Sequence, residues 1–233
     1  MALKKITPNQ MKKILITLSI ALLMFTACGG PNLPDITVLL EEPIPSRPAE
    51  IPEAYYETLI TRLEDTRETI KTVTDPSEIE TIYTAYLDLG NIYRDLNENE
   101  KAITGYEKAI EAGGGRGLAA WLSKGALLER IGEYKEAEKA YREIISVGAN
   151  EQAHFRLALL LRQHTNGSES EIREVYENSL TLFGYFTNSA QDYLIYLVEI
   201  GDTARADEIV DAALERDPSN EGYLKIKESY DNL

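Results

Sequence analysis

The sequence predicts an all-α fold from residue 53 onward, built as an α-solenoid. Apolar residues recur at the helical period of three to four positions throughout this part of the chain. No stretch there alternates polar and apolar residues as a half-buried strand would. The same small and aromatic residue types also return after 35 residues, and a repeat of that length indicates stacked helical units.

The repeat is clearest in two consecutive segments. Each has a glycine, an alanine 12 residues later and a tyrosine 4 residues after that: Gly90, Ala102, Tyr106 and Gly125, Ala137, Tyr141. Small side chains allow two antiparallel helices to approach closely, and we expect the aromatic rings to fill the space between one helix pair and the next. Gly132 is expected at the turn between two helices, where glycine adopts a positive φ at little cost.

This pattern resembles the tetratricopeptide repeat (TPR), and the resemblance covers roughly residues 53–231. It implies a right-handed α-solenoid of about four to five TPR-like helix pairs with a C-terminal capping helix. We assign residues 83–220 to the repeats and 221–233 to the cap. The third repeat, which begins near His154, has a turn at 165–168 that is about two residues longer than usual.

The segment 53–82 is predicted to hold an N-terminal helix and the entry to the first repeat. A helix is expected from Glu53 to Val73, and it could be the second half of a degenerate repeat. Pro76, with Glu78 behind it, is a start signal for the next helix, because proline is tolerated at the first helical position.

The first 52 residues have a different character. Residues 1–27 are predicted to be a lipoprotein-type signal peptide, because Lys12 and Lys13 precede an apolar run that is shorter than the ~20 residues a membrane-spanning helix needs. The segment resembles a lipobox, with Ala27 before Cys28, the only cysteine. Phe25 stands where such boxes usually have leucine. Residues 28–52 contain six of the nine prolines and are predicted to be a tether that begins at lipidated Cys28.

The charge of the chain excludes one class of partner. Four of the 24 basic residues and none of the 39 acidic residues precede Cys28, so the part from Cys28 onward has 20 basic residues and a net charge of −19. Such a surface is repelled by phosphate, and nucleic acid is therefore not expected as a partner.

The resemblance also implies where a partner would bind. In this family the first helices of successive repeats line a concave face that binds peptides. Nine residues of the first three repeats are expected there: Leu87, Asn91, Arg94, Leu122, Ala126, Glu129, Phe155, Leu159 and Arg162. In the fourth repeat the face continues with Gln191, Ile195 and Val198. Only Asn91 fits the set by which some members hold a carboxylate, so a carboxylate clamp is not expected. An amphipathic helix or an extended apolar segment suits this face better. Alternatively, several of these side chains are buried between helices.

No catalytic, metal or cofactor site is predicted, and the chain is interpreted as a non-enzyme. His154 and His164 are ten residues apart, which does not match the i, i+4 spacing of metal ligands on a helix. His154 takes an aromatic core position of the repeat, and His164 is expected near a turn in contact with solvent. The glycine-rich stretch 113–117 lacks the Lys-Ser/Thr of a phosphate-binding loop and is read as a turn between repeats.

Together these observations predict a membrane-anchored TPR lipoprotein that acts as an adaptor or scaffold for another protein in the bacterial cell envelope. Gly29 follows Cys28, so no aspartate is present to retain the lipoprotein at an inner membrane. This favours the outer membrane if two membranes exist, and otherwise the outer face of the cytoplasmic membrane. Two alternatives are an accessory docking subunit of a solute transporter or envelope enzyme, and a self-assembling lipoprotein that forms homo-oligomers.

Overall fold

The computed structural model describes residues 37–73, 75–114 and 117–231, and in this part every regular element is helical. The predicted signal peptide, Cys28 and the first part of the predicted tether lie outside these residues. The chain divides into two compact units, residues 1–42 and 43–233. In the first unit the described residues form one short helix, α2 (Thr37–Glu41).

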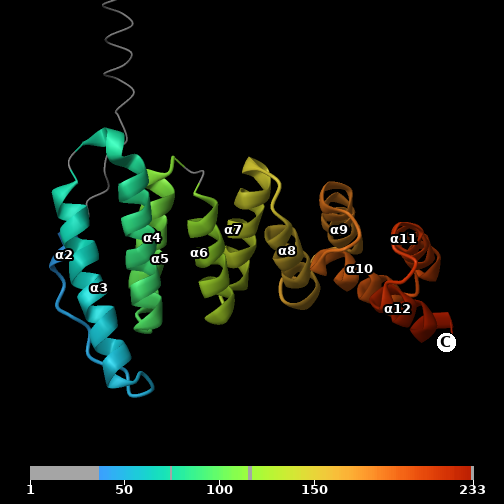
Figure 1. Cartoon of the computed structure of the whole chain (residues 1–233), viewed down its shortest axis with the longest axis horizontal. Helices are drawn as coiled ribbons and strands as arrows, with labels where there is room; N and C mark the ends of the chain where they lie inside the picture. Colours follow the sequence, from blue (N-terminus) through green and yellow to red (C-terminus); the bar gives the residue numbers. More distant parts are fainter. Residues whose placement is uncertain (1–36, 74, 115–116, 232–233) are drawn as a thin grey trace, which may run out of the picture. The chain divides into compact units, whose positions relative to one another are not determined.

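The second unit contains the solenoid. Its helices are α3 (Glu53–Thr72), the 3₁₀ turn η1 (Pro76–Glu78), α4 (Ile79–Asp95), α5 (Asn99–Ala112), α6 (Leu118–Arg130), α7 (Tyr134–Val147), α8 (Glu151–Gln163), α9 (Glu169–Phe183), α10 (Asn188–Glu199), α11 (Thr203–Arg216) and α12 (Glu221–Asp231). Consecutive helices pack against one another in chain order (Figure 1). The α-solenoid prediction is therefore confirmed.

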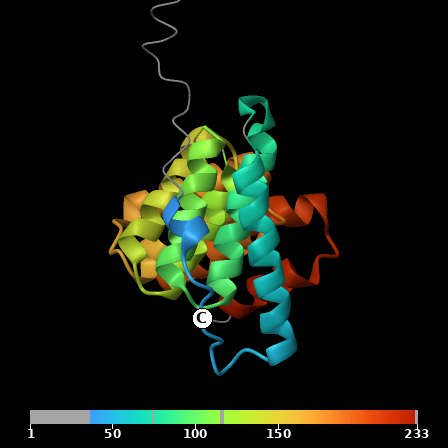
Figure 2. The same cartoon turned by 90° about the vertical axis from the view of Figure 1, so that its left-hand side faces the viewer.

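The described helices form four pairs: α4–α5, α6–α7, α8–α9 and α10–α11. The expected N-terminal helix is α3, which packs beside α4, as the view in Figure 2 also shows. The helix α12 packs against α11 at the other end. The first pair begins at Ile79, four residues before the expected start of the repeats. Pro76 opens the 3₁₀ turn just before it, and the side chain of Asp75 accepts a hydrogen bond from the Ser77 N–H (2.8 Å).

The turn inside each pair has a residue with a positive φ. These residues are Asn97 (61°), Gly132 (84°), Asn166 (55°) and Gly201 (79°). At Gly132 the N–H donates to the carbonyl of Glu129 (3.1 Å), and the next N–H donates to that of Leu128 (2.9 Å). This is the Schellman arrangement that ends a helix. Five residues separate α8 from α9, whereas three separate the helices of the other pairs, so the predicted longer third turn is confirmed.

Glycine is required where the helices of a pair meet. A Cβ at Gly90 would lie 2.5 Å from Cδ1 of Tyr106, and one at Gly125 would lie 2.9 Å from Cε1 of Tyr141. The close approach is as predicted. However, the rings of Tyr106 and Tyr141 were expected to fill the space between one helix pair and the next. Both rings instead lie against the glycine of their own pair.

Tyrosine supplies much of the core. Of the tyrosines whose burial the structure describes, seven are fully buried: Tyr86, Tyr93, Tyr106, Tyr141, Tyr176, Tyr193 and Tyr223. The Tyr176 and Tyr193 rings stack with centroids 4.8 Å apart and join the third pair to the fourth. Burial, with a smaller contribution from Glu111, raises the pKa of Tyr86 to about 12. Trp121 on α6 is only half-buried.

Candidate partner-binding face

Three first helices place the nine predicted residues at matching positions. We call these nine residues the groove face. They are Leu87, Asn91 and Arg94 on α4, Leu122, Ala126 and Glu129 on α6, and Phe155, Leu159 and Arg162 on α8. On each helix they are spaced i, i+4, i+7, which brings them to one side. The first helix α4 contacts the first helix α6, and α8 contacts α10, so the first helices are adjacent at both ends of the groove face.

None of the nine side chains is buried. Ala126 is exposed, and the other eight are half-buried. None of the nine residues is therefore fully enclosed between helices. In the fourth pair, Gln191 and Ile195 are exposed and Val198 is half-buried, and the Ile195 side chain is 52% exposed. The face thus offers apolar surface on all four first helices.

At α4 the polar residues of the groove face bind one another. Asn91 Oδ1 accepts hydrogen bonds from the Tyr106 hydroxyl (3.0 Å) and from Nη1 of Arg94 (3.2 Å). Arg94 also contacts Oδ1 of Asp95 through Nε (3.0 Å) and Nη2 (2.8 Å). Asn91 is therefore already engaged within the chain.

Glu129 occupies the corresponding end of α6. One of its carboxylate oxygens lies 3.3 Å from Nη1 of Arg156, which joins the second pair to the third. The other oxygen is buried and has no hydrogen-bond partner among the described residues. Burial and the neighbouring Glu129 carboxylate both raise the pKa of Tyr141 well above its ordinary value.

Arg162 serves mainly to join helices. Its guanidinium contacts the Tyr176 hydroxyl (3.1 Å), Asp192 Oδ2 (2.8 Å) and Glu199 Oε2 (2.7 Å), so it links α8 to α9 and α10. Burial opposes the charge, but Tyr176 and Asp192 hold the pKa of Arg162 above its ordinary value. The side chain is only 11% exposed. Sequence reasoning found Arg162 and missed Asp192, because the two lie 30 positions apart on different pairs.

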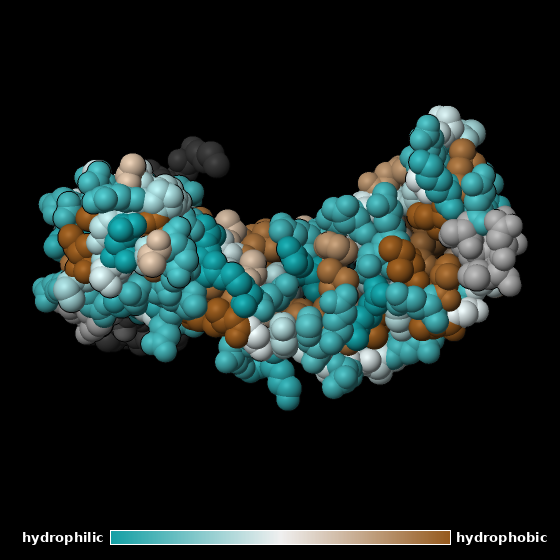
Figure 3. Space-filling model, turned by 90° about the horizontal axis from the view of Figure 1, so that it is seen from below, coloured by the Kyte–Doolittle hydropathy of each residue, from teal (hydrophilic) through white to brown (hydrophobic). Residues whose placement is uncertain are grey.

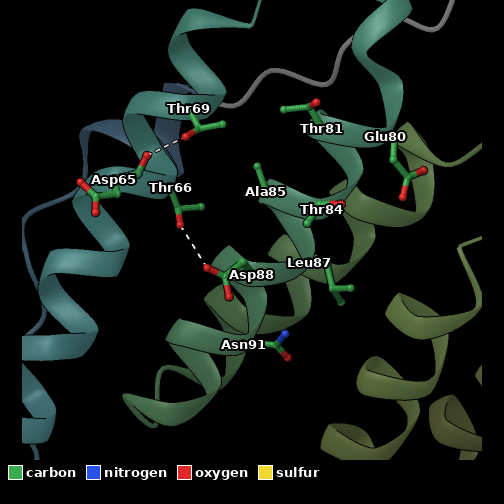
Figure 4. Close-up of a pocket in the computed structure, with 10 residues that line it drawn as sticks. All are labelled: Asp65, Thr66, Thr69, Glu80, Thr81, Thr84, Ala85, Leu87, Asp88 and Asn91. Carbon is green, nitrogen blue, oxygen red and sulfur yellow. Dashed lines mark hydrogen bonds between the residues drawn. The ribbon is translucent and has the colours of Figure 1, made fainter.

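A hollow that sequence reasoning did not find adjoins the groove face at its N-terminal end. It has a volume of about 640 Å³ and lies along α3 and α4; Figure 4 shows its lining. Leu87 and Asn91 belong to both the hollow and the groove face. The other lining residues are Asp65, Thr66, Thr69, Glu80, Thr81, Thr84, Ala85 and Asp88.

The two histidines take structural positions. His154 is buried, with Nδ1 2.8 Å from the carbonyl of Asn150, and its ring meets that of Phe183 edge to face. The expected core role of His154 is confirmed. His164 is exposed and ends α8, as predicted, and its ring stacks on Tyr134 with centroids 3.8 Å apart.

Within residues 37–73, 75–114 and 117–231, no group of three or more histidine, cysteine, aspartate or glutamate residues is arranged to hold a metal ion. Among the same residues, no helix is both long enough and apolar enough to span a bilayer.

Comparison with known proteins agrees with this geometry. Residues 87–154 match the family model of the tetratricopeptide repeat. These residues contain most of the first two helix pairs and seven of the pattern positions described above. The chain has the fold of a TPR solenoid.

Two solved structures resemble this TPR solenoid. That of MamA has a TM-score of 0.50 and 19% identity, and the match covers 77% of this chain and 96% of MamA. That of YrrB, described as a TPR protein with an unusual peptide-binding site, has a TM-score of 0.50 and 18% identity. Its match covers 69% of this chain and 88% of YrrB. At these identities the likeness concerns the fold alone. No curated protein matches the sequence.

Proposed function

We propose that this TPR solenoid is a lipid-anchored adaptor of the bacterial cell envelope that holds another protein, or a peptide segment of it, on the groove face. The observation that carries the proposal is the exposure of this face. Leu87, Leu122, Phe155 and Leu159 remain partly accessible to solvent, although the surrounding helices bury comparable apolar residues completely. Apolar surface that repeats along adjacent first helices suits the apolar side of a bound segment.

The pairing of charges supports an apolar partner. Arg94, Glu129 and Arg162 each have an oppositely charged neighbour within the chain. A partner therefore gains little by offering charges at these points, since it would have to compete with existing ion pairs. Specificity along the central groove face then comes mainly from the shape and spacing of apolar side chains. YrrB, which shares the fold, is described as having a peptide-binding site.

Crosslinking in native membranes tests this function. We compare the native protein with a groove variant, Leu122→Asp with Phe155→Asp. A control variant, Val147→Asp with Leu182→Asp, places the same two charges on exposed apolar residues of α7 and α9. Circular dichroism first shows that each variant is folded. Ala126→Arg serves as a second groove variant, because Ala126 is exposed and its replacement leaves the core intact.

The proposal expects one defined partner that is captured by the native protein and by the control, and lost from both groove variants. A partner that all four proteins retain would place the interface elsewhere and favour the docking subunit of a transporter or envelope enzyme. Capture of the protein's own copies alone would replace the adaptor by a homo-oligomer.

Self-assembly is the second candidate, and one observation favours it. Among the described residues, half of the large apolar side chains that are exposed lie in the part from α9 to α12: Leu182, Phe186, Ile195, Ile200 and Leu224. In Figure 3 the hydrophobic surface likewise forms separate patches, the broadest of them toward the C-terminal helices. Sedimentation velocity of the full chain in detergent tests this candidate. A monomer at micromolar concentration would exclude it.

The anchor is part of the same proposal. Lipid on Cys28 would hold the protein at the outer membrane, or at the outer face of the cytoplasmic membrane in a cell with one membrane. Several acyl chains are needed for stable attachment, because one gives only marginal binding. Metabolic labelling with an alkyne-tagged palmitate tests this. We expect label and membrane fractionation for the native protein and loss of both for Cys28→Ser. An unlabelled native protein would contradict the anchor.

A further inference from the structure

The hollow between α3 and α4 differs in charge from the rest of the groove face. Three carboxylates line it, and no lysine or arginine does. Figure 4 shows Asp65 at the α3 edge, Glu80 at the α4 edge and Asp88 between them. Asp88 is paired with Arg62 and accepts a hydrogen bond from Thr66 (3.3 Å). Asp65 and Glu80 are exposed and have no ion-pair partner among the described residues.

This lack of pairing is local. The charged residues that the groove face contributes from α4, α6 and α8 are each neutralised by a neighbour in the chain, as described above. The hollow therefore keeps unbalanced negative charge at one end of an otherwise balanced face. A cationic group placed there would be attracted by carboxylates on both sides.

The shape of the hollow favours one kind of cationic ligand. Asp65 and Glu80 lie at opposite edges, so they do not form the compact oxygen cage that a divalent cation needs. Apart from Asp88 and Asn91, the rest of the lining consists of threonines with Ala85 and Leu87, which offer methyl groups and hydroxyls. Such a floor suits the aliphatic stem of lysine or arginine, with the charged end at a carboxylate. A second copy of this chain, with its net charge of −15, is a poor match.

We propose that the hollow along α3 and α4 binds a basic stretch of the partner, whose lysine or arginine side chains lie between Asp65 and Glu80 while the adjoining apolar stretch lies on the groove face. The inference rests on the proposed function. It adds the chemistry of the partner, which is a segment with a basic end followed by apolar residues. The hollow is continuous with the groove face, because Leu87 and Asn91 line the hollow and also belong to the groove face.

Two fluorescent peptides test this with the full chain in detergent. The basic probe is acetyl-Arg-Ala-Arg-Ala-Leu-Ala-Ala-Leu amide, and the neutral probe has glutamine in place of both arginines. The test variant is Asp65→Asn with Glu80→Gln. Its control is Glu57→Gln with Glu64→Gln, two exposed α3 carboxylates outside the hollow, so both variants lose the same net charge.

Fluorescence anisotropy should show the native protein and the control binding the basic probe about tenfold more tightly than the neutral one, since each exposed charge pair contributes a factor of about 1.4 to 5. The test variant should bind the basic probe less than about twofold more tightly than the neutral probe. Raising the salt from about 0.05 to 0.5 M should weaken binding of the basic probe selectively.

Three results would overturn the inference. Equal affinity of the native protein for both probes would remove the basic preference and leave the groove function intact. An equal loss in test and control variants would show general attraction by net charge. No binding of the basic probe up to about 1 mM would refute the hollow as a site. Failure of the groove function itself is recognised separately, by the crosslinking of the groove variants.

Discussion

Replacing Gly90 by alanine tests the close approach of helices on which the solenoid depends. A methyl group at this position would lie 2.5 and 2.6 Å from Cδ1 and Cε1 of Tyr106 and 3.1 Å from the carbonyl oxygen of Ala102. Carbon atoms in favourable contact are about 3.5 to 4.0 Å apart, so the ring would have to move by about 1 Å. Tyr106 is fully buried, and its hydroxyl is bonded to Asn91, so the ring has no free direction to move.

The expected cost follows from two opposing effects. Overpacking of a well-filled core costs about 1 to 3 kcal/mol. Alanine favours the helix over glycine by about 1 kcal/mol, which offsets part of that cost. Because the ring would have to move so far, we place the overpacking cost in the upper part of that range, at about 2 to 3 kcal/mol. We therefore expect Gly90→Ala to lower the free energy of unfolding by about 1 to 2 kcal/mol, and the Tm by about 2 to 8 °C for a chain of this size.

Thermal unfolding followed by circular dichroism measures this effect. Gly148→Ala is the control, because Gly148 has an extended backbone and a Cβ there would have no neighbour within 4 Å. The control should be unchanged or more stable by about 0.4 to 1 kcal/mol. A Gly90→Ala protein as stable as the native one would refute the close packing of Gly90 on Tyr106.

Three further changes have defined outcomes. Asn97→Gly should keep or slightly raise the Tm, whereas Asn97→Val should lower it, because φ at Asn97 is 61° and a β-branched residue is strained there. Arg162→Ala should lower the free energy of unfolding by about 2 to 3 kcal/mol in urea denaturation, since it leaves Asp192 without its cation. Burial alone would raise the pKa of Glu177, but Arg205 lowers it below the ordinary value. The stability from this carboxylate is present above about pH 4.3 and is lost as the pH falls through the lowered pKa. Thermal melts of Glu177→Gln should therefore show a smaller fall in Tm between about pH 5 and 3 than those of the native protein.

The fold was predictable because the repeat determines it locally. Gly90 and Gly125 mark where helices meet, and Gly132 marks a turn; these positions are readable from spacing alone. The longer third turn was also visible, as a polar insertion at 165–168. Asn97 was not recognised as a turn residue with positive φ, because asparagine adopts other conformations equally well.

The candidate site was predictable only in part. Helical spacing placed the nine residues on one side of α4, α6 and α8. It could not show that Arg162 is held by Asp192, because contacts between different pairs depend on the angle at which the pairs stack. The hollow was missed for the same reason. Asp65 and Glu80 are ordinary exposed carboxylates in the sequence, and only the packing of α3 beside α4 brings them to one surface.

Site-specific photocrosslinking tests the central claim most directly. A photoreactive phenylalanine analogue replaces Ala126, which is exposed on the groove face, or Glu143, which is exposed on the second helix α7. If the groove face binds a partner, irradiation of cells should give one discrete adduct from position 126 and none from position 143. Adducts of the same mass from both positions, or from position 143 alone, would contradict the account.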